Sequence, residues 1–93
     1  MILHNGFKFG GEVVKMTDFG DGKGGNIIVS GASKHGDVKL SVLLNETMFR
    51  KICDKDFPKV IVSGHIEQRT HETDGHNLKH SLRYVADELE IAS

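Results

Sequence analysis

The stretch Val38–Gly64, VKLSVLLNETMFRKICDKDFPKVIVSG, changes its hydrophobic period twice. Its first part places four apolar side chains on one face of an extended chain, which predicts a strand with one buried side. From Asn45 the apolar residues recur at i,i+4, which predicts a helix of about two to three turns with Asn45 as its N-cap. Pro58 closes that helix, and alternation resumes at Lys59. The stretch therefore predicts strand, short helix, strand.

Two further strands are expected before this stretch. The segment Phe7–Met16 alternates, and the pair Gly10-Gly11 inside it marks a bulge or a sharp bend. The glycine-rich segment Asp18–Asn26 is a turn region. A second strand follows in the sequence NIIVSGA, and the sequence SKHGD then makes a tight turn.

Two strands are also expected after the helix. The segment Lys59–Arg69 alternates, and Asp74-Gly75 is a strong hairpin signal. The last strand covers Leu78–Ile91, and its apolar residues move from even to odd positions, which requires a bulge or twist near Ala86. The element order is thus β-β-β-α-β-β.

This order predicts an all-β protein with one short helix, a five-stranded OB-fold barrel formed by residues 1–93 as a single domain. An SH3-like small barrel is the alternative, and it fits the single helix less well. The net charge of −1 gives no global signal for nucleic acid. The one cysteine, Cys53, cannot form an internal disulfide, and together with the absence of a membrane span or secretion signal this favours the cytoplasm.

Three short motifs follow one another in the second half of the chain. They are V-x-V-x-G-x-I at Val60–Ile66, the dipeptide Asp74-Gly75, and VADEL at Val85–Leu89. In this order, after an apolar strand and a short helix, they resemble the core of the bacterial and phage single-stranded DNA-binding proteins. The match covers roughly the C-terminal 55 residues well and the N-terminal part more loosely.

The resemblance implies sequence-independent binding of single-stranded DNA in replication, recombination or repair. The residues form no spaced acid pair and no Ser/His/Asp or Cys/His arrangement, so neither enzymatic activity nor a cofactor is expected. The resemblance also implies a homo-oligomer, a dimer or tetramer, with replication proteins as possible partners and no membrane contact. The ending DELEIAS lacks the acidic tail of the cellular proteins, so either a minimal phage or plasmid type or a truncated domain is expected. A replisome or primosome adaptor that acts through protein contacts is the alternative.

The chain departs from the family in its aromatic residues. It contains no tryptophan, and the resemblance places Val38 and Leu44 at the third-strand stacking positions and His71 at the hairpin one. Stacking contributes about 1–3 kcal/mol per base, so binding should be weaker than in the family. Phe19 in the glycine-rich loop is the best exposed stacking residue, with His71 and Tyr84 as further candidates.

Basic residues on strands and loops provide what a groove for a phosphate backbone requires. The glycine-rich loop is either a plain hairpin loop or a flap that carries Phe19 and Lys23 over the DNA. The candidate nucleic-acid-binding residues are Lys8, Lys15, Phe19, Lys23, Lys34, Lys39, Arg69, His71, Lys79 and Arg83.

Four histidines lie between Gly64 and His80, but their spacing matches no standard zinc motif, so no metal site is expected. Imidazoles at His71 and His80 could stack on bases and gain charge, which would strengthen DNA binding at lower pH. Cys53 is expected to be a buried thiol. The phenylalanines expected in the core are Phe7, Phe9, Phe49 and Phe57.

Overall fold

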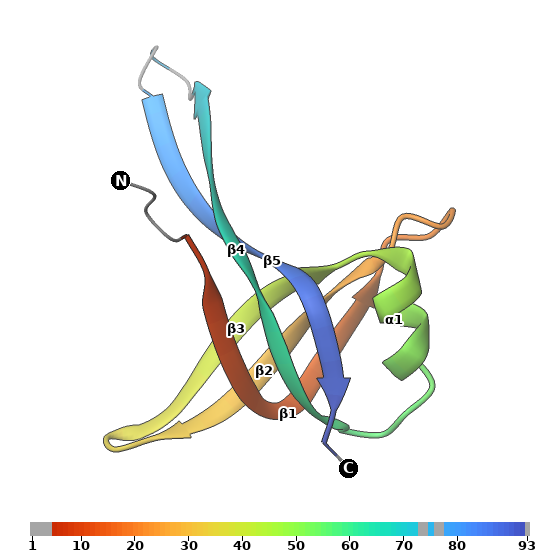
Figure 1. Cartoon of the computed structure of the whole chain (residues 1–93). Coiled ribbons are helices and arrows are strands. Elements are labelled where there is room, and N and C mark those ends of the chain that lie inside the picture. Colours follow the sequence, from red (N-terminus) through yellow and green to blue (C-terminus); the bar gives the residue numbers. More distant parts are fainter. Residues whose placement is uncertain (1–4, 73–74, 76–77, 93) are drawn as a thin grey trace.

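The computed structural model describes residues 5–72, 75 and 78–92, apart from the side chains of Arg69, His71, Lys79 and His80. The strands close into a barrel in the order β1-β2-β3-β5-β4, in which only the β3–β5 pair is parallel. This is the predicted OB-fold order, with one short helix between the third and fourth strands (Figure 1). The elements are β1 (Phe7–Asp18), β2 (Gly25–Ser33), β3 (Gly36–Leu44), α1 (Glu46–Ile52), β4 (Lys59–Glu72) and β5 (Leu78–Ile91).

Strand β1 bends sharply and belongs to both halves of the barrel (Figure 1). Its first half, Phe7–Glu12, pairs with β4, and the part from Glu12 to Asp18 pairs with β2. The register shifts between Val13 and Lys15, so the bulge lies at Val14, beyond the glycine pair where the sequence suggested a bulge or bend. Gly11 instead allows close packing, because a Cβ there would overlap the carbonyl oxygen of Ser30.

The core fills the barrel, and α1 covers one end of it. Helix residues Met48, Phe49 and Ile52 are buried against the strands. Asn45 caps the helix as predicted, since its Oδ1 accepts a hydrogen bond from the Met48 N–H at 2.8 Å. The buried core residues are Val13, Ile27, Val29, Val42, Leu44, Met48, Phe49, Ile52, Val60, Val62 and Ala86.

Two residues of the α1–β4 connection contradict the sequence prediction. Helix α1 ends at Ile52, so Cys53 is the C-cap and its thiol is exposed rather than buried. Phe57 was expected in the core, yet it is 64% exposed. Helix α1 ends one residue before Cys53. Where the chain re-enters the barrel, Pro58 is buried and Phe57 is not. Phe7 and Phe9 are partly buried against the core, and Phe49 is fully buried, as expected.

Strands β4 and β5 continue beyond the barrel as a two-stranded ribbon (Figure 1). β5 pairs with β3 only at Val42–Tyr84 and Leu43–Val85, so the rest of the ribbon extends past β3. The ladder places Ser63 opposite Glu88 and Gly64 opposite Ala86. Asp87 is therefore the extra residue of a bulge, which confirms the irregularity predicted near Ala86.

The tip of this ribbon lies largely outside the described residues. Gly75 is in a turn with φ of 89°, in agreement with a glycine hairpin signal, whereas Asp74 is not described. In the part of the chain that the structure covers, no helix is long and apolar enough to cross a membrane.

Candidate nucleic-acid interface

The outer surface of β1, β2 and β3 carries rows of side chains that cross the three strands. Residues of β2 alternate, so Ile27 and Val29 point into the barrel and their neighbours point outward. The ladders then fix which outward residues lie side by side. The rows are Glu12–Ser30–Lys39, Lys15–Ile28–Ser41 and Thr17–Asn26–Leu43.

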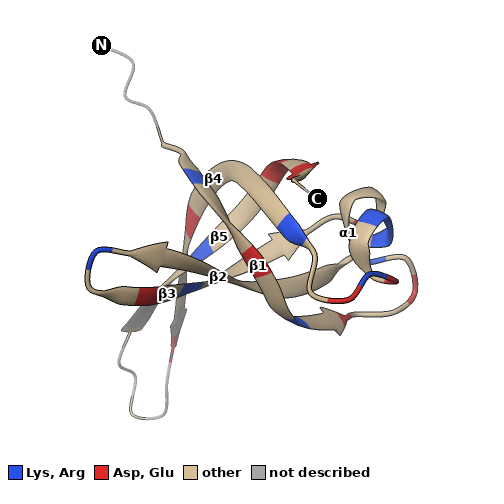
Figure 2. Cartoon of the chain, turned by 90° about the horizontal axis from the view of Figure 1, so that it is seen from below, with Lys and Arg blue, Asp and Glu red and all other residues tan. Residues whose placement is uncertain are grey.

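Two lysines stand on either side of β2 in these rows. Lys15 on β1 lies opposite Ile28, and Lys39 on β3 lies opposite Ser30, both with exposed side chains. Neighbouring strands are about 4.8 Å apart, so the two lysine columns are separated by about 10 Å. Glu12 shares a row with Lys39 and reduces the local positive charge. Over the barrel as a whole, basic and acidic residues are interspersed (Figure 2).

The face between the lysines is polar. The Asn26 amide donates to the Ser41 hydroxyl at 2.9 Å, and that hydroxyl lies 3.2 Å from Asn26 Oδ1. A hollow over β1, β2 and β3 is lined by Ser30 and Lys39 together with two carboxylates, Glu12 and Asp37. The three rows, all of whose residues are described, contain no aromatic side chain. Bases on this face would therefore meet polar groups and Ile28.

Val38 and Leu44 stand where the resemblance places aromatic residues of the third strand, and the two side chains differ in their exposure. Leu44 is only 3% exposed and belongs to the core, so no base could stack there. Val38 is 45% exposed, although it has the inward phase of β3, because it lies where β2 and β3 extend past the closed part of the barrel.

The β1–β2 loop is a closed hairpin with defined hydrogen bonds. The Phe19 N–H donates to the Gly24 carbonyl at 3.0 Å, and the Gly20 N–H donates to Asp18 Oδ1 at 2.8 Å. Phe19 is 48% exposed, as its position in the loop predicted, and Lys23 is exposed beside it. The loop therefore presents an aromatic ring and a cation next to the rows of β1–β3.

The base of this loop is tied to the helix. Arg50 of α1 donates to Asp18 Oδ2 at 2.9 Å and to Glu46 Oε1 at 2.7 Å. The pKa of the Asp18 carboxyl is lowered, first by the hydrogen bond from the Gly20 N–H and then by Arg50. The loop is thus anchored at its N-terminal end.

Other predicted lysines lie further from the rows. Lys34 is exposed in the β2–β3 turn, at the far end of that hairpin. Lys8 also points outward, but it lies opposite Ser63 of β4, in the half of β1 that does not pair with β2. The structure thus gathers Lys15, Lys39 and the loop residues on one side and leaves Lys8 beside β4.

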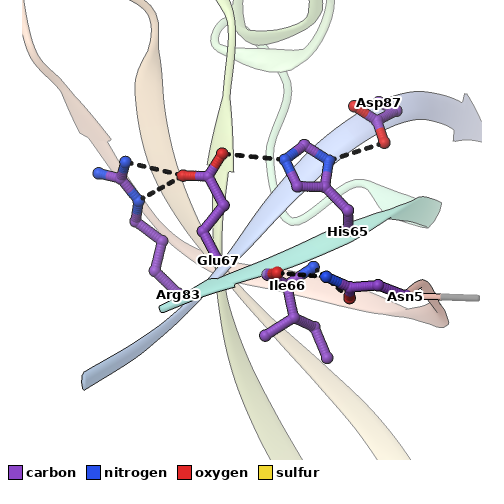
Figure 3. A network of polar contacts seen from close by, with 6 residues as sticks. All are labelled: Asn5, His65, Ile66, Glu67, Arg83 and Asp87. Carbon is purple, nitrogen blue, oxygen red and sulfur yellow. Dashed lines mark hydrogen bonds and ion pairs between the residues drawn. The ribbon is translucent and has the colours of Figure 1, made fainter. Parts of the chain in front are cut away.

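Arg83 is engaged in a chain of polar contacts on the outer face of β4 and β5 (Figure 3). Its guanidinium donates to Glu67 Oε1 at 2.9 and 3.2 Å, while Glu67 Oε2 lies 3.0 Å from His65 Nε2. The other ring nitrogen of His65, Nδ1, lies 2.9 Å from Asp87 Oδ2. A phosphate would therefore have to compete with Glu67 for Arg83.

This network raises the pKa of His65, first through the hydrogen bond with Asp87 and then through that with Glu67. The pKa of Glu67 is lowered, by His65 first and by Arg83 second. This network was not predicted from the sequence. The contact between His65 and Glu67 could have been predicted, because the two residues are two positions apart and therefore lie on one face of β4. The contact between His65 and Asp87 could not, because it depends on the bulge in β5.

The remaining candidates lie on the ribbon. Arg69, His71 and Lys79 have strand backbone, with His71 opposite Lys79, and their side chains lie outside the described part of the structure. Tyr84 is half-buried and its ring contacts that of Phe7 edge to face, with centroids 5.4 Å apart. Its ring is therefore already used in packing. Among the described side chains, no group of three or more His, Cys, Asp or Glu could hold a metal ion.

Comparisons with known proteins find structural likeness without sequence likeness. No family model matches the sequence, and no curated protein matches it. The mitochondrial single-stranded DNA-binding protein Rim1 from S. cerevisiae superposes with a TM-score of 0.72 at 9% identity, covering 98% of this chain and 97% of that one. The chain is an OB-fold barrel.

Two further solved structures share this barrel. A selenomethionine-labelled crystal of Rim1 gives a TM-score of 0.65 at 10% identity, over 98% of this chain and 97% of that one. The N-terminal domain of PriB from Thermoanaerobacter tencongensis, a dimeric structure, gives 0.65 at 15% identity, over 96% and 97%. At such low identities the likeness establishes the OB fold alone, and the function has to be argued from the residues of the candidate interface.

Proposed function

We propose that this protein binds single-stranded DNA without sequence preference, through the outer face of β1–β3 and the β1–β2 loop. The observation that carries the proposal is the pair Lys15 and Lys39, which flank the polar outer surface of β2 on an OB barrel. The likeness to Rim1, a single-stranded DNA-binding protein, supports it. OB folds bind oligonucleotides on their second and third strands and the adjoining loops.

In this proposal the lysines contact phosphates and the bases lie over Ile28 and the Asn26–Ser41 pair. Affinity then comes mainly from counterion release and depends strongly on salt. Phe19 supplies a stacking surface beside the face, and Lys23 and Lys34 add charge at its ends. Arg69, His71 and Lys79 are proposed as contacts from the ribbon, and Lys8 and Arg83 as weaker ones. A role in replication or recombination, and a phage or plasmid type, belong to the same proposal.

A homo-oligomer is part of the proposal. Leu78 and Leu82 on the ribbon are 67% and 63% exposed, although they have the inward phase of β5. An isolated two-stranded ribbon is marginally stable in water, and a second copy that covers these leucines would stabilise it. The dimeric form of the PriB domain agrees with such an arrangement.

The competing function is an adaptor that binds a protein. The net charge of −1 and the absence of aromatic residues in the β1–β3 rows favour it. The polar Asn26–Ser41 pair and the lysines on either side of β2 favour nucleic acid instead, because a protein-docking surface has an apolar centre.

Fluorescence anisotropy with labelled oligo-dT and with duplex DNA tests the proposal. The wild-type protein should prefer oligo-dT, and Lys15→Gln with Lys39→Gln should weaken binding by roughly 10-fold or more at low salt. Lys51→Gln, an exposed lysine in the last turn of α1, is the control and should leave the affinity unchanged. No binding at low salt, or equal loss in the control, would contradict the proposal.

A further inference from the structure

Phe57 has a conformation that packing does not explain. It is 64% exposed, and its φ of 43° lies in the left-handed region that bulky residues rarely adopt. The following residue is Pro58, which restricts the backbone of Phe57 further. The fold thus holds a large apolar ring in solvent at a conformational cost.

The neighbours of Phe57 fix its position. Pro58 is buried, and its carbonyl accepts a hydrogen bond from the Val13 N–H of β1 at 2.8 Å. On the other side, the Lys55 N–H donates to the Ile52 carbonyl at the end of α1, at 3.0 Å. The short connection is therefore held at both ends, and the ring of Phe57 is placed beside β1.

A hollow lies between Phe57 and β1. Its apolar lining includes Val14 and Met16, and its charged lining groups are Lys15, Lys55 and Asp56. Two cations and one anion leave the hollow with a net positive charge. An aromatic ring beside cations is the combination that binds one base and its flanking phosphates.

This hollow adjoins the proposed DNA face. Val14 lines both the hollow at Phe57 and the hollow over β1, β2 and β3 that includes Ser30 and Lys39. The bulge at Val14 is the cause, because consecutive residues Val14 and Lys15 both remain accessible while Val13 is buried. A single strand of DNA that crosses the face from β3 over β2 to β1 would reach Phe57 next.

We propose that Phe57, flanked by Lys15 and Lys55, is a base-stacking subsite at the β1 end of the DNA face. This inference rests on the proposed function. Stacking on Phe57 is independent of base identity, since every base has a π-face. It also supplies an aromatic surface that the three rows of β1–β3 lack, and Lys15 serves both the face and the subsite.

Tryptophan substitution tests the subsite directly, because the chain contains no tryptophan. In Phe57→Trp, the only indole should be quenched when oligo-dT binds, and an abasic oligonucleotide of equal length should quench it far less. Cys53→Trp places an exposed indole in the same connection but outside the hollow, so it is the matched control and should change little.

A second variant separates stacking from folding. Asparagine tolerates the left-handed backbone, so Phe57→Asn should fold normally and bind oligo-dT roughly 5- to 100-fold more weakly. Its affinity for the abasic oligonucleotide should remain that of the wild type. Thermal unfolding of the variant verifies that the barrel is intact.

The outcomes distinguish the two proposals. If wild-type protein binds oligo-dT while Phe57→Trp shows no quenching and Phe57→Asn binds as tightly as wild type, the subsite is wrong and the proposed function stands. If the wild-type protein binds no single-stranded DNA at low salt, the proposed function fails and the subsite fails with it. Quenching in both Trp variants would also overturn the subsite.

Discussion

Gly64 shows how one residue of the V-x-V-x-G motif acts in the barrel. It lies on β4 opposite Ala86, directly beside the Asp87 bulge. A Cβ at Gly64 would overlap the Val85 carbonyl oxygen and would lie 2.9 Å from both the Ala86 Cα and the Asp87 nitrogen. The bulged strand therefore packs against bare backbone, and the glycine allows this close approach.

Substitution of Gly64 should consequently be far more costly than substitution of Gly10, a strand glycine that has room for a Cβ. We expect Gly64→Ala to lower the free energy of unfolding by at least about 2 kcal/mol, because backbone atoms cannot move aside as a flexible side chain could. Gly10→Ala on β1 is the control, since its Cβ would have only ordinary contacts at 3.5 and 3.6 Å. Urea unfolding measures both variants, and equal losses would contradict the explanation.

The ribbon formed by β4 and β5 is stabilised at its base by side chains as well as by its ladder. His65 receives contacts from carboxylates on both sides, Asp87 from β5 and Glu67 from its own strand, and Glu67 continues to Arg83 (Figure 3). These contacts favour the protonated imidazole, which raises the pKa of His65 in the folded protein.

This network predicts a pH dependence of stability. The pKa of His65 is higher in the folded protein than its unfolded value of about 6.5. Its stabilising contribution is therefore fully present below pH of about 6.5 and is lost as the pH rises through the folded pKa. The urea midpoint of the wild type should fall more between pH 6 and 9 than that of His65→Gln. His35→Gln, in the exposed β2–β3 turn, should retain the wild-type dependence, and a wild-type dependence in His65→Gln would contradict the prediction.

At the scale of the whole molecule, charge is balanced and aromatic surface is sparse. The net charge is −1, and acidic groups are interspersed with basic ones (Figure 2). Binding of DNA cannot then come from a long-range field and must depend on a few lysines placed by the fold. The proposed face and subsite provide three, Lys15, Lys39 and Lys55.

Three phosphate contacts predict a modest salt dependence. The slope of log K against log salt should be at least about −2 in size for single-stranded DNA from these three lysines alone, a loss of roughly 20-fold in affinity between 50 and 200 mM salt, and the proposed contacts of the loops and the ribbon would make it steeper. Lys15→Gln with Lys39→Gln should make the slope shallower by about 1.4. Anisotropy titrations across a salt series measure this, and an unchanged slope in the double variant would show that Lys15 and Lys39 do not contact phosphates.

Local patterns were enough to predict the elements and their order. Alternation located the five strands, with both ends of β5 as expected, and the i,i+4 spacing after Asn45 located α1 and its cap. The phase change near Ala86 predicted the bulge. Such features depend on neighbours in sequence, because strand faces, helix faces and caps are set within a few residues.

Only the tertiary structure decided which side chains are exposed and which meet. Val38 lies on the predicted buried face of its strand and is 45% exposed, and Cys53 and Phe57, which looked like core residues, are exposed as well. Arg83 looked free for phosphate and contacts Glu67, and the hollow at Phe57 joins residues of β1 to the α1–β4 connection. The sequence by itself determined the elements and their order, from which the barrel was predicted, because hydrophobic periodicity is a local property of the chain. The barrel's closure and the bulges at Val14 and Asp87 determined the surface, because they set which distant strands lie side by side.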